Sequence, residues 1–264
     1  MTIRTLTANT TGPITIDAHL LNHPGTITVR ATPQCTRATL TIRTSSRSGP
    51  AADIVRTATL RQDGARLIVR AINNSHATRH HARNIINPAS SGAPTIQADT
   101  INGAIHLGGS QATLTATAPQ QPAPITIDVT VPENSSVTAR TNSADITIAG
   151  TITDATAATQ SGHIHIERAA NTSAKTHLGN ITLGHTQIAD ANTRSGDINI
   201  LNASGHIWAT TESGDIAAHA TAECGITADT RSGDITITAT APAIAARLSV
   251  RTRTKSGRVR IPQR

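Results

Sequence analysis

The stretch TRSGDINI at residues 193–200 decides the fold, because close copies of it recur along the second half of the chain. The next two copies read TESGDIAA at 211–218 and TRSGDITI at 230–237. Aligned without gaps, the copies begin at Thr141, Thr159, Thr176, Thr193, Thr211, Thr230 and Thr254, and an earlier copy begins at Thr100. A short unit repeated at a nearly fixed interval is typical of a solenoid.

Each copy is interpreted as two short strands joined at a corner. Small or branched residues stand two and four positions before each threonine, which is the alternation of a strand with one buried face. After the Ser-Gly-Asp corner, a second strand buries alternate residues such as Ile198 and Ile200. A glycine with positive φ before a short polar residue is typical of a tight turn or bulge. The repeat therefore predicts an all-β, single-stranded β-solenoid with rungs of 17–19 residues.

Inward positions of successive copies lie one above the other in such a stack. We expect one buried column that consists of Ile146, Ile164, Ile181, Ile198, Ile216 and Ile235. The chain of 264 residues contains no Phe and no Tyr, which fits a narrow interior that Ala, Thr and Ile fill and an aromatic ring would over-pack. Proteins that bind RNA or single-stranded DNA stack bases on aromatic side chains, so we expect no sequence-specific binding of nucleic acid.

The first part of the chain is rich in predicted strands but carries no repeat. Segments 14–20, 26–31 and 38–44 alternate cleanly, and Asp63-Gly64 between two alternating runs indicates a hairpin. A loop rich in His and Arg follows at 76–92. We interpret residues 1–94 as an N-terminal β-sheet cap that leads into a β-solenoid at residues 95–264. The proline-containing stretches 118–124 and 239–246 are expected to lie outside the central strand pairing.

Together, the Ser-Gly-Asp-Ile corners, the stretch VTVPENSSVTARTNSADITIAG at 129–150 and the opening strands resemble a large bacterial family. It is the β-strand-repeat "putative adhesin" family, a domain of unknown function, and the resemblance is to a soluble, actinobacterial-like member. The similarity runs from about Ile14 to Ile261. It implies a β-solenoid with no known catalytic activity, and it offers no catalytic residues to transfer to this chain.

Catalytic motifs are missing from the sequence. Since it has no G-x-S-x-G elbow, no P-loop and no H-E-x-x-H, we expect no enzyme activity, no catalytic residue and no cofactor. The residues after the corner glycines form one column, in which Asp197, Asp215 and Asp234 are weak candidates for a divalent-cation site because stacked carboxylates repel unless neutralised. The alternative is that Asp and Asn suit a tight turn, and we expect no metal.

Histidines that could form a zinc cluster occur in two places. They are His76, His80 and His81 in one loop, and His163, His165, His177 and His185 in two neighbouring units. Exposed polar residues are the alternative interpretation. The two cysteines, Cys35 and Cys224, lack metal-ligand spacing and are interpreted as unpaired structural thiols, with a disulfide between them as the alternative.

Candidate partner contacts lie at Trp208 and in the last repeat. Trp208 stands between two inward residues and so points outward, where it either contacts a partner or is covered by another segment such as loop 118–124. The outward cations of the last repeat are Arg251, Arg253, Lys255, Arg258 and Arg260. Their charge either protects an unpaired strand edge from end-to-end stacking or forms a patch for an acidic partner.

These observations favour a non-enzymatic, adhesin-like scaffold that binds an unidentified protein partner. The alternative is a protein that binds an acidic polymer or a membrane surface through arginine-rich faces, which suits the formal charge of +7. Because the sequence shows neither a signal peptide nor an apolar stretch of membrane-spanning length, we expect a cytoplasmic monomer without a membrane span.

Overall fold

The computed structural model describes residues 1–73, 122–245 and 248–262. All of its strands and helices belong to one compact unit, which comprises residues 1–73 and 123–264. Two predictions, the repeat at Thr100 and the histidine-rich loop with His76, His80 and His81, lie outside the described residues.

The secondary structure of the described residues is almost entirely β. The strands are β1 (Thr2–Thr7), β2 (Thr15–Leu21), β3 (Gly25–Thr32), β4 (Thr39–Thr44), β5 (Thr59–Asp63), β6 (Arg66–Ile72), β7 (Ile125–Pro132), β8 (Ser136–Thr141), β9 (Asp145–Ala158), β10 (Ile164–Lys175), β11 (Ile181–Ser195), β12 (Ile198–Ser213), β13 (Ile216–Ser232), β14 (Ile235–Ala239), β15 (Ser249–Ser256) and β16 (Val259–Arg260). The helices are α1 (Pro50–Thr57) and α2 (Ala241–Ala245), and α2 falls in the proline-containing stretch that was predicted to leave the ladder.

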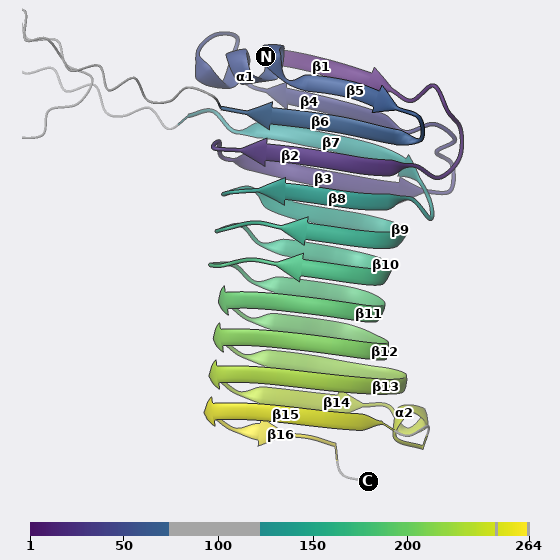
Figure 1. Cartoon of the computed structure of the whole chain (residues 1–264), viewed down its shortest axis with the longest axis vertical. Helices are drawn as coiled ribbons and strands as arrows, with labels where there is room; N and C mark the ends of the chain where they lie inside the picture. Colours follow the sequence, from purple (N-terminus) through teal and green to yellow (C-terminus); the bar gives the residue numbers. More distant parts are fainter. Residues whose placement is uncertain (74–121, 246–247, 263–264) are drawn as a thin grey trace, which may run out of the picture. The chain divides into compact units, whose positions relative to one another are not determined.

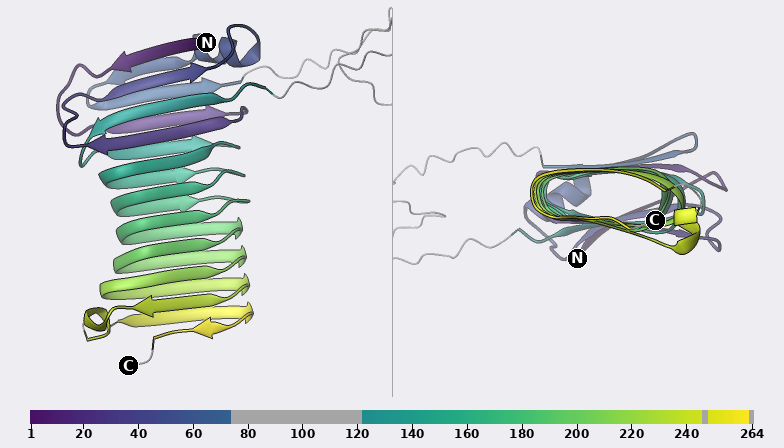
Figure 2. Two further views of the ribbon diagram at one scale, coloured as in Figure 1. Left: turned by 180° about the vertical axis from the view of Figure 1, so that it is seen from behind. Right: turned by 90° about the horizontal axis from the view of Figure 1, so that it is seen from below.

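This unit is an elongated, flattened coil with a front and a back face (Figure 1). Each of the strands β9 to β13 runs along the back face, turns, and returns along the front face, so that a single strand supplies both sides of a rung. Parallel pairing joins each rung to the next, and β15 on the front face and β14 with β16 on the back face complete the stack. Seen along its length, the rungs superimpose as a flattened ring (Figure 2). The predicted β-solenoid is therefore confirmed.

Isoleucines form the predicted inward column. Strand register places side by side, in this order, Ile146, Ile164, Ile181, Ile198, Ile216 and Ile235. Each of these side chains is at most 1% exposed. The column continues into the first part of the chain through Ile27 and Ile127. Complete burial of an isoleucine side chain contributes about 1.5–3 kcal/mol, so this column is a main source of stability.

The recurring threonine is buried in the described repeats from Thr141 to Thr230, is half-buried at Thr254, and makes the same hydrogen bond in successive rungs. Thr193 Oγ1 donates to the carbonyl oxygen of Gly179 in the preceding rung, at 3.2 Å. Equivalent bonds to the preceding corner are made by Thr176, Thr211, Thr230 and Thr254. A buried hydroxyl without a partner would cost about 1–3 kcal/mol, so this bond explains how a polar residue occupies an inward position.

Close packing between rungs requires the corner glycine. A Cβ at Gly196 would lie 2.1 Å from the carbonyl oxygen of Gly179, and a Cβ at Gly214 would lie equally close to that of Gly196. The predicted positive φ occurs at Gly214 (149°) and at Gly233 and Gly257 (both 154°), but not at Gly196. The prediction of a positive φ was thus wrong for part of the corners, because the shared requirement is the close approach of two backbones.

Strands from the first part of the chain are built into the stack. On the front face β2 lies between β6 and β8, and on the back face β3 lies between β7 and β9. The strands β7 and β8, which follow one another in the chain, therefore pair with β3 and β2. At the start of β8, the N–H of Ser136 donates to the carbonyl oxygen of Ile14 at 3.0 Å. Residues 1–73 thus share one sheet with the repeats. The boundary predicted at residue 94 lies outside the described residues and stays a prediction.

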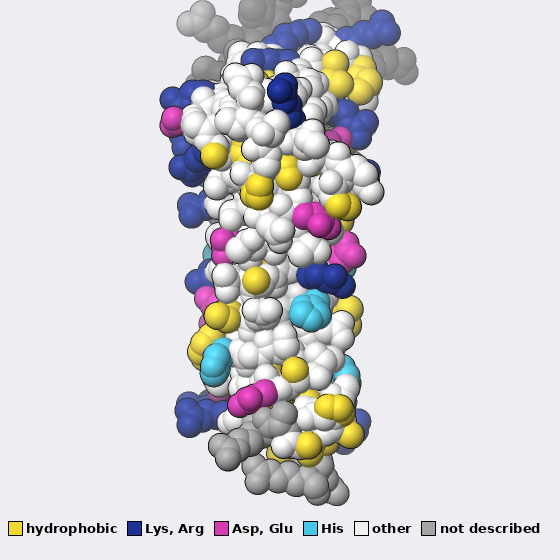
Figure 3. All heavy atoms as spheres, turned by 90° about the vertical axis from the view of Figure 1, so that its right-hand side faces the viewer, with side chains coloured by type: hydrophobic (Ala, Val, Ile, Leu, Met, Phe, Trp, Pro, Cys, Tyr) yellow, Lys and Arg dark blue, Asp and Glu magenta, His cyan; other side chains and the backbone are white. Residues whose placement is uncertain are grey.

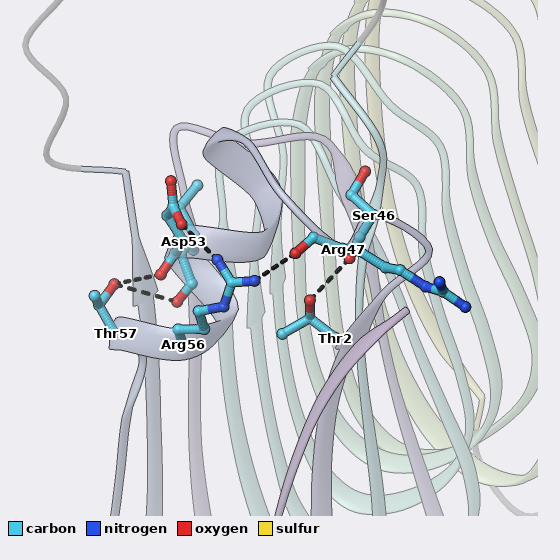
Figure 4. Close-up of polar contacts among 7 residues, drawn as sticks. Thr2, Ser46, Arg47, Asp53, Arg56 and Thr57 are labelled. Carbon is cyan, nitrogen blue, oxygen red and sulfur yellow. Dashed lines mark hydrogen bonds and ion pairs between the residues drawn. The ribbon is translucent and has the colours of Figure 1, made fainter.

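Helix α1 packs against β1, β4 and β6 at one end of the stack. Its buried residues are Ala51, Ala52, Ile54 and Val55. Within the helix, Arg56 bonds to Asp53 at 2.9 Å, and it ties the helix to the preceding loop by donating to the carbonyl oxygen of Arg47 (Figure 4). Beside the helix, β5 and β6 form the predicted antiparallel hairpin at Asp63-Gly64.

Candidate functional site

The corner side chains form a hydrogen-bonded ladder along the edge of the stack. Asp197 Oδ1 accepts the backbone N–H of Asp215 at 2.9 Å, and Asp215 Oδ1 accepts that of Asp234 at 2.7 Å. The ladder continues from Asp234 Oδ1 to the N–H of Arg258, at 2.8 Å. On the other side, His163 Nδ1 accepts the N–H of Asn180. Each corner side chain therefore provides the acceptor for the backbone of the next rung.

This ladder explains why Asp, Asn and His all occur in one column, since each side chain offers a hydrogen-bond acceptor at the same position. One oxygen of each aspartate is already bonded to a backbone N–H. Among the residues that the structure describes, no group of three or more His, Cys, Asp and Glu side chains could hold a metal ion, and this includes the predicted His163, His165, His177 and His185. Asp197, Asp215 and Asp234 thus have a structural role that needs no cation.

A cluster of exposed apolar side chains lies on the front face. Trp208 on β12 is 47% exposed, and its ring stacks on that of His206 with centroids 6.0 Å apart and planes 23° from parallel. Ile188 on β11, also 47% exposed, lies beside His206 in the strand register. On the other side of His206 is Gly225, which has no side chain to cover the imidazole. We call Ile188, His206 and Trp208 the front-face patch.

Charged side chains around the patch are paired with one another. Lys175 Nζ lies 3.4 Å from Asp190, the residue that neighbours Trp208 in the register. Glu212 Oε2 lies 3.4 Å from Arg194 and 3.5 Å from Arg231, in a row along the edge of the same face. The charges closest to the patch thus form ion pairs, which is the arrangement of an apolar contact with a polar rim. Arg251, two strands from Trp208 in the register, forms no ion pair within the described residues.

The cations of the last rung are arranged differently. Arg251, Arg253, Lys255, Arg258 and Arg260 are all exposed. Within the described residues, none of the five lies within ion-pair distance of an acidic side chain, in contrast to the paired cations around the patch. The structure therefore gathers cations that form no ion pair within the described residues at one end of the stack, where Asp229 is the acidic register neighbour of Arg253.

Figure 3 shows the side of the stack on which the strands turn from the back face to the front face. Basic, acidic and histidine side chains are interspersed along it, and apolar side chains gather at the end that carries the last rung.

Both cysteines are free thiols. Cys35 is partly exposed and Cys224 is buried, and no disulfide joins them. Burial raises the pKa of the Cys224 thiol above its ordinary value, against an opposing effect from its backbone hydrogen bond to Gly205. A raised pKa reduces the thiolate fraction, so Cys224 has the properties of a structural core residue.

Two residues of the front-face patch were not predicted from the sequence. His206 and Ile188 become neighbours only through a register shift between Thr186 and Ile188, which a count along the repeat does not reveal. The available signal was that His206 and Trp208 both precede inward residues, Ile207 and Ala209, and therefore share the outward phase.

The fold and its surfaces define a β-solenoid built from short, parallel rungs. A comparison with protein families matches residues 124–264, more than half of the chain, to the family described as Toastrack DUF4097. The chain belongs to the Toastrack DUF4097 family, whose function is unknown. This confirms the resemblance to the β-strand-repeat family that the corners and strands indicated.

One solved structure shows the same fold. The chain is similar to a "putative adhesin" from Bacteroides fragilis, with a TM-score of 0.53 and 16% identity over 98% of this chain and 97% of that chain. Weaker similarities are to a "putative lipid binding protein" from Parabacteroides distasonis (TM-score 0.45, 12% identity, 99% and 97% covered) and to a "putative adhesin" from Parabacteroides merdae (0.43, 9%, 99% and 96%). No curated protein matches the chain. Among the described residues, no helix is long and apolar enough to span a membrane.

Proposed function

We propose that this protein is a non-enzymatic, adhesin-like scaffold that binds a protein partner through the front-face patch. The observation that carries the proposal is the half-exposed Trp208, stacked on His206 and beside the exposed Ile188. Tryptophan is among the residues that dominate binding energy at protein interfaces, and an exposed apolar cluster with a polar rim is typical of such a site.

Rigidity of the scaffold supports this role. Trp208 and Ile188 are held on neighbouring parallel strands whose inward residues, such as Ile207 and Ala189, are buried in the continuous core. A preorganised surface loses little conformational entropy on binding, so a few apolar side chains suffice for a specific contact. The Bacteroides protein of similar fold is described as a "putative adhesin", which agrees with a binding role rather than a catalytic one.

Binding of an acidic polymer or a membrane surface is the second candidate. The exposed cations of the last rung favour it, because clustered positive charge attracts polyanions. Salt separates the two candidates: attraction between exposed charges is screened over about 8 Å at physiological ionic strength, whereas apolar contacts persist.

A pull-down from native lysate tests the proposal. The immobilised protein should retain one partner at both low and high salt, and Trp208→Ala should weaken that binding by about 30-fold or more, the effect of losing an interface hot spot. The matched control is Leu201→Ala, because Leu201 is 46% exposed on the same strand but lies outside the patch. Full retention by Trp208→Ala, or equal loss from both variants, would contradict the proposal. Retention that disappears at high salt would favour the second candidate.

A further inference from the structure

The last rung presents an unpaired strand edge. Strand β15 pairs only with β13, and β16 pairs only with β14, so their outer edges have no strand partner among the described residues. Of β14, only Ile235 and Thr236 are covered by β16. Backbone N–H and C=O groups along such an edge are a template for pairing with a further strand.

An apolar hollow of about 320 Å³ opens at this same end. It is lined by Ile244, Leu248, Val250, Ile261 and Pro262. Val250 lies beside Ile226 in the register, so the hollow continues the interior of the solenoid. The end of the stack therefore exposes a piece of the core as well as an edge.

The side chains of β15 alternate in chemistry across the strand. Arg251, Arg253 and Lys255 are exposed, while Val250, Thr252 and Thr254 are half-buried and extend the inward columns. None of the exposed cations lies within ion-pair distance of an acidic side chain in the described parts of the chain. A strand added to this edge would thus place alternate residues over the hollow and the others beside exposed cations.

We propose that this end binds an extended acidic segment of a partner protein as an additional β-strand, with acidic residues alternating with apolar ones. The backbone edge provides hydrogen bonds, the hollow receives the apolar side chains, and Arg251, Arg253 and Lys255 pair with the acidic ones. A second copy of the chain fits poorly, because two such ends repel, and at the opposite end of the stack α1 packs against the terminal strand β1. The site uses the outer edge of β15, two strands beyond Trp208 on the same face, and includes none of the patch residues, so its test is separate from that of the proposed function.

Fluorescence anisotropy with a labelled peptide of alternating glutamate and valine tests this inference. The peptide matches the eight residues of β15 in length. The full chain should bind it, should not bind the same peptide with lysine in place of glutamate, and should bind more weakly as salt rises. The variant Arg251→Ser/Arg253→Ser/Lys255→Ser should bind about tenfold more weakly. The control variant Arg168→Ser/Lys175→Ser/Arg194→Ser removes the same charge from β10 and β11 and should bind normally.

N-methylation of the peptide tests the strand geometry. One set of alternate amides faces β15 and the other faces solvent, so methylating the first set should abolish binding and methylating the second should not. Equal effects of the two sets, or equal weakening by the two triple variants, would overturn the proposal. Two further outcomes would also overturn it. In the first, heparin binds and the peptide does not, which assigns the cations to a polyanion. In the second, the variant Arg251→Ser/Arg253→Ser/Lys255→Ser self-associates and the unaltered chain binds no peptide, which assigns the cations to protection of the strand edge.

Discussion

Replacing Gly196 by alanine tests the reason for the glycine at each corner. The new Cβ would lie 2.1 Å from the carbonyl oxygen of Gly179, so this oxygen would have to retreat by about 1 Å or more to reach ordinary contact. The same oxygen accepts the hydroxyl of Thr193 at 3.2 Å. Over-packing costs about 1–3 kcal/mol and the lost hydrogen bond costs about 1 kcal/mol. Alanine also lowers the conformational entropy of the unfolded chain, which stabilises the folded state by about 0.4–1 kcal/mol. We expect the free energy of unfolding to fall by about 2 kcal/mol.

Urea unfolding followed by far-ultraviolet circular dichroism measures this change. The matched control is Gly225→Ala, since a Cβ at Gly225 would come close only to the side chain of His206, at 3.2 Å, which is exposed and can move, and would lie at ordinary contact distance, 3.9 Å, from the carbonyl oxygen of Gly205. The control should change the free energy of unfolding by no more than about 0.5 kcal/mol. If the Gly196 variant were as stable as this control, the close approach of the corners would not be what requires glycine.

Four further predictions address the core, the ladder, the thiols and catalysis. Ile198→Asp should lower the free energy of unfolding by about 4 kcal/mol or more, because an unpaired charge enters the apolar column. In the same urea experiment, the control Asn199→Asp on the outer side of the same strand should change the free energy of unfolding by less than about 0.5 kcal/mol. Asp215→Ala should lower the free energy of unfolding by about 1 kcal/mol, because it removes the acceptor for the backbone of the next rung, whereas Asp215→Asn should be nearly neutral. If both variants lost the same stability and calcium stabilised the unaltered protein, the aspartates would instead form a cation site. Burial raises the pKa of Cys224, so at pH 8 iodoacetamide should modify Cys35 well before Cys224, and mass spectrometry showing the reverse order would contradict the burial. Ester, glycoside and nucleotide substrates should not be turned over, and hydrolysis that is lost when a corner aspartate is changed would refute this.

Local alternation was sufficient to predict the repeated part of the fold. The inward phase of Ile198 and Ile200 follows from a period of two, and the corner between the strands follows from the Ser-Gly-Asp signal. The chemical role of the corner was not predictable in the same way. Asp215 serves the backbone of the next rung, a bond between residues 19 positions apart that appears only when the rungs are stacked.

Pairing between distant segments lay beyond the reach of the sequence. The insertion of β2 and β3 between the strands β6 to β9 depends on contacts such as Ile14 with Ser135, which are 121 positions apart and follow no repeat. Helix α1 was missed because its eight residues are too few to show a clear helical period. For the front-face patch, the outward phase of Trp208 was readable, but its stacking partner and Ile188 required the register of the strands.

Site-specific photocrosslinking in native lysate tests most directly whether the front-face patch binds a protein partner. A photoreactive phenylalanine derivative replaces Thr210, which is exposed beside Trp208 on the front face, or Asn199, which is exposed on the back face of the same strand. The account predicts one discrete protein adduct from position 210, its loss when Trp208→Ala is added, and no adduct from position 199. The same adducts from both positions, or an adduct from position 210 that persists without the indole, would contradict it.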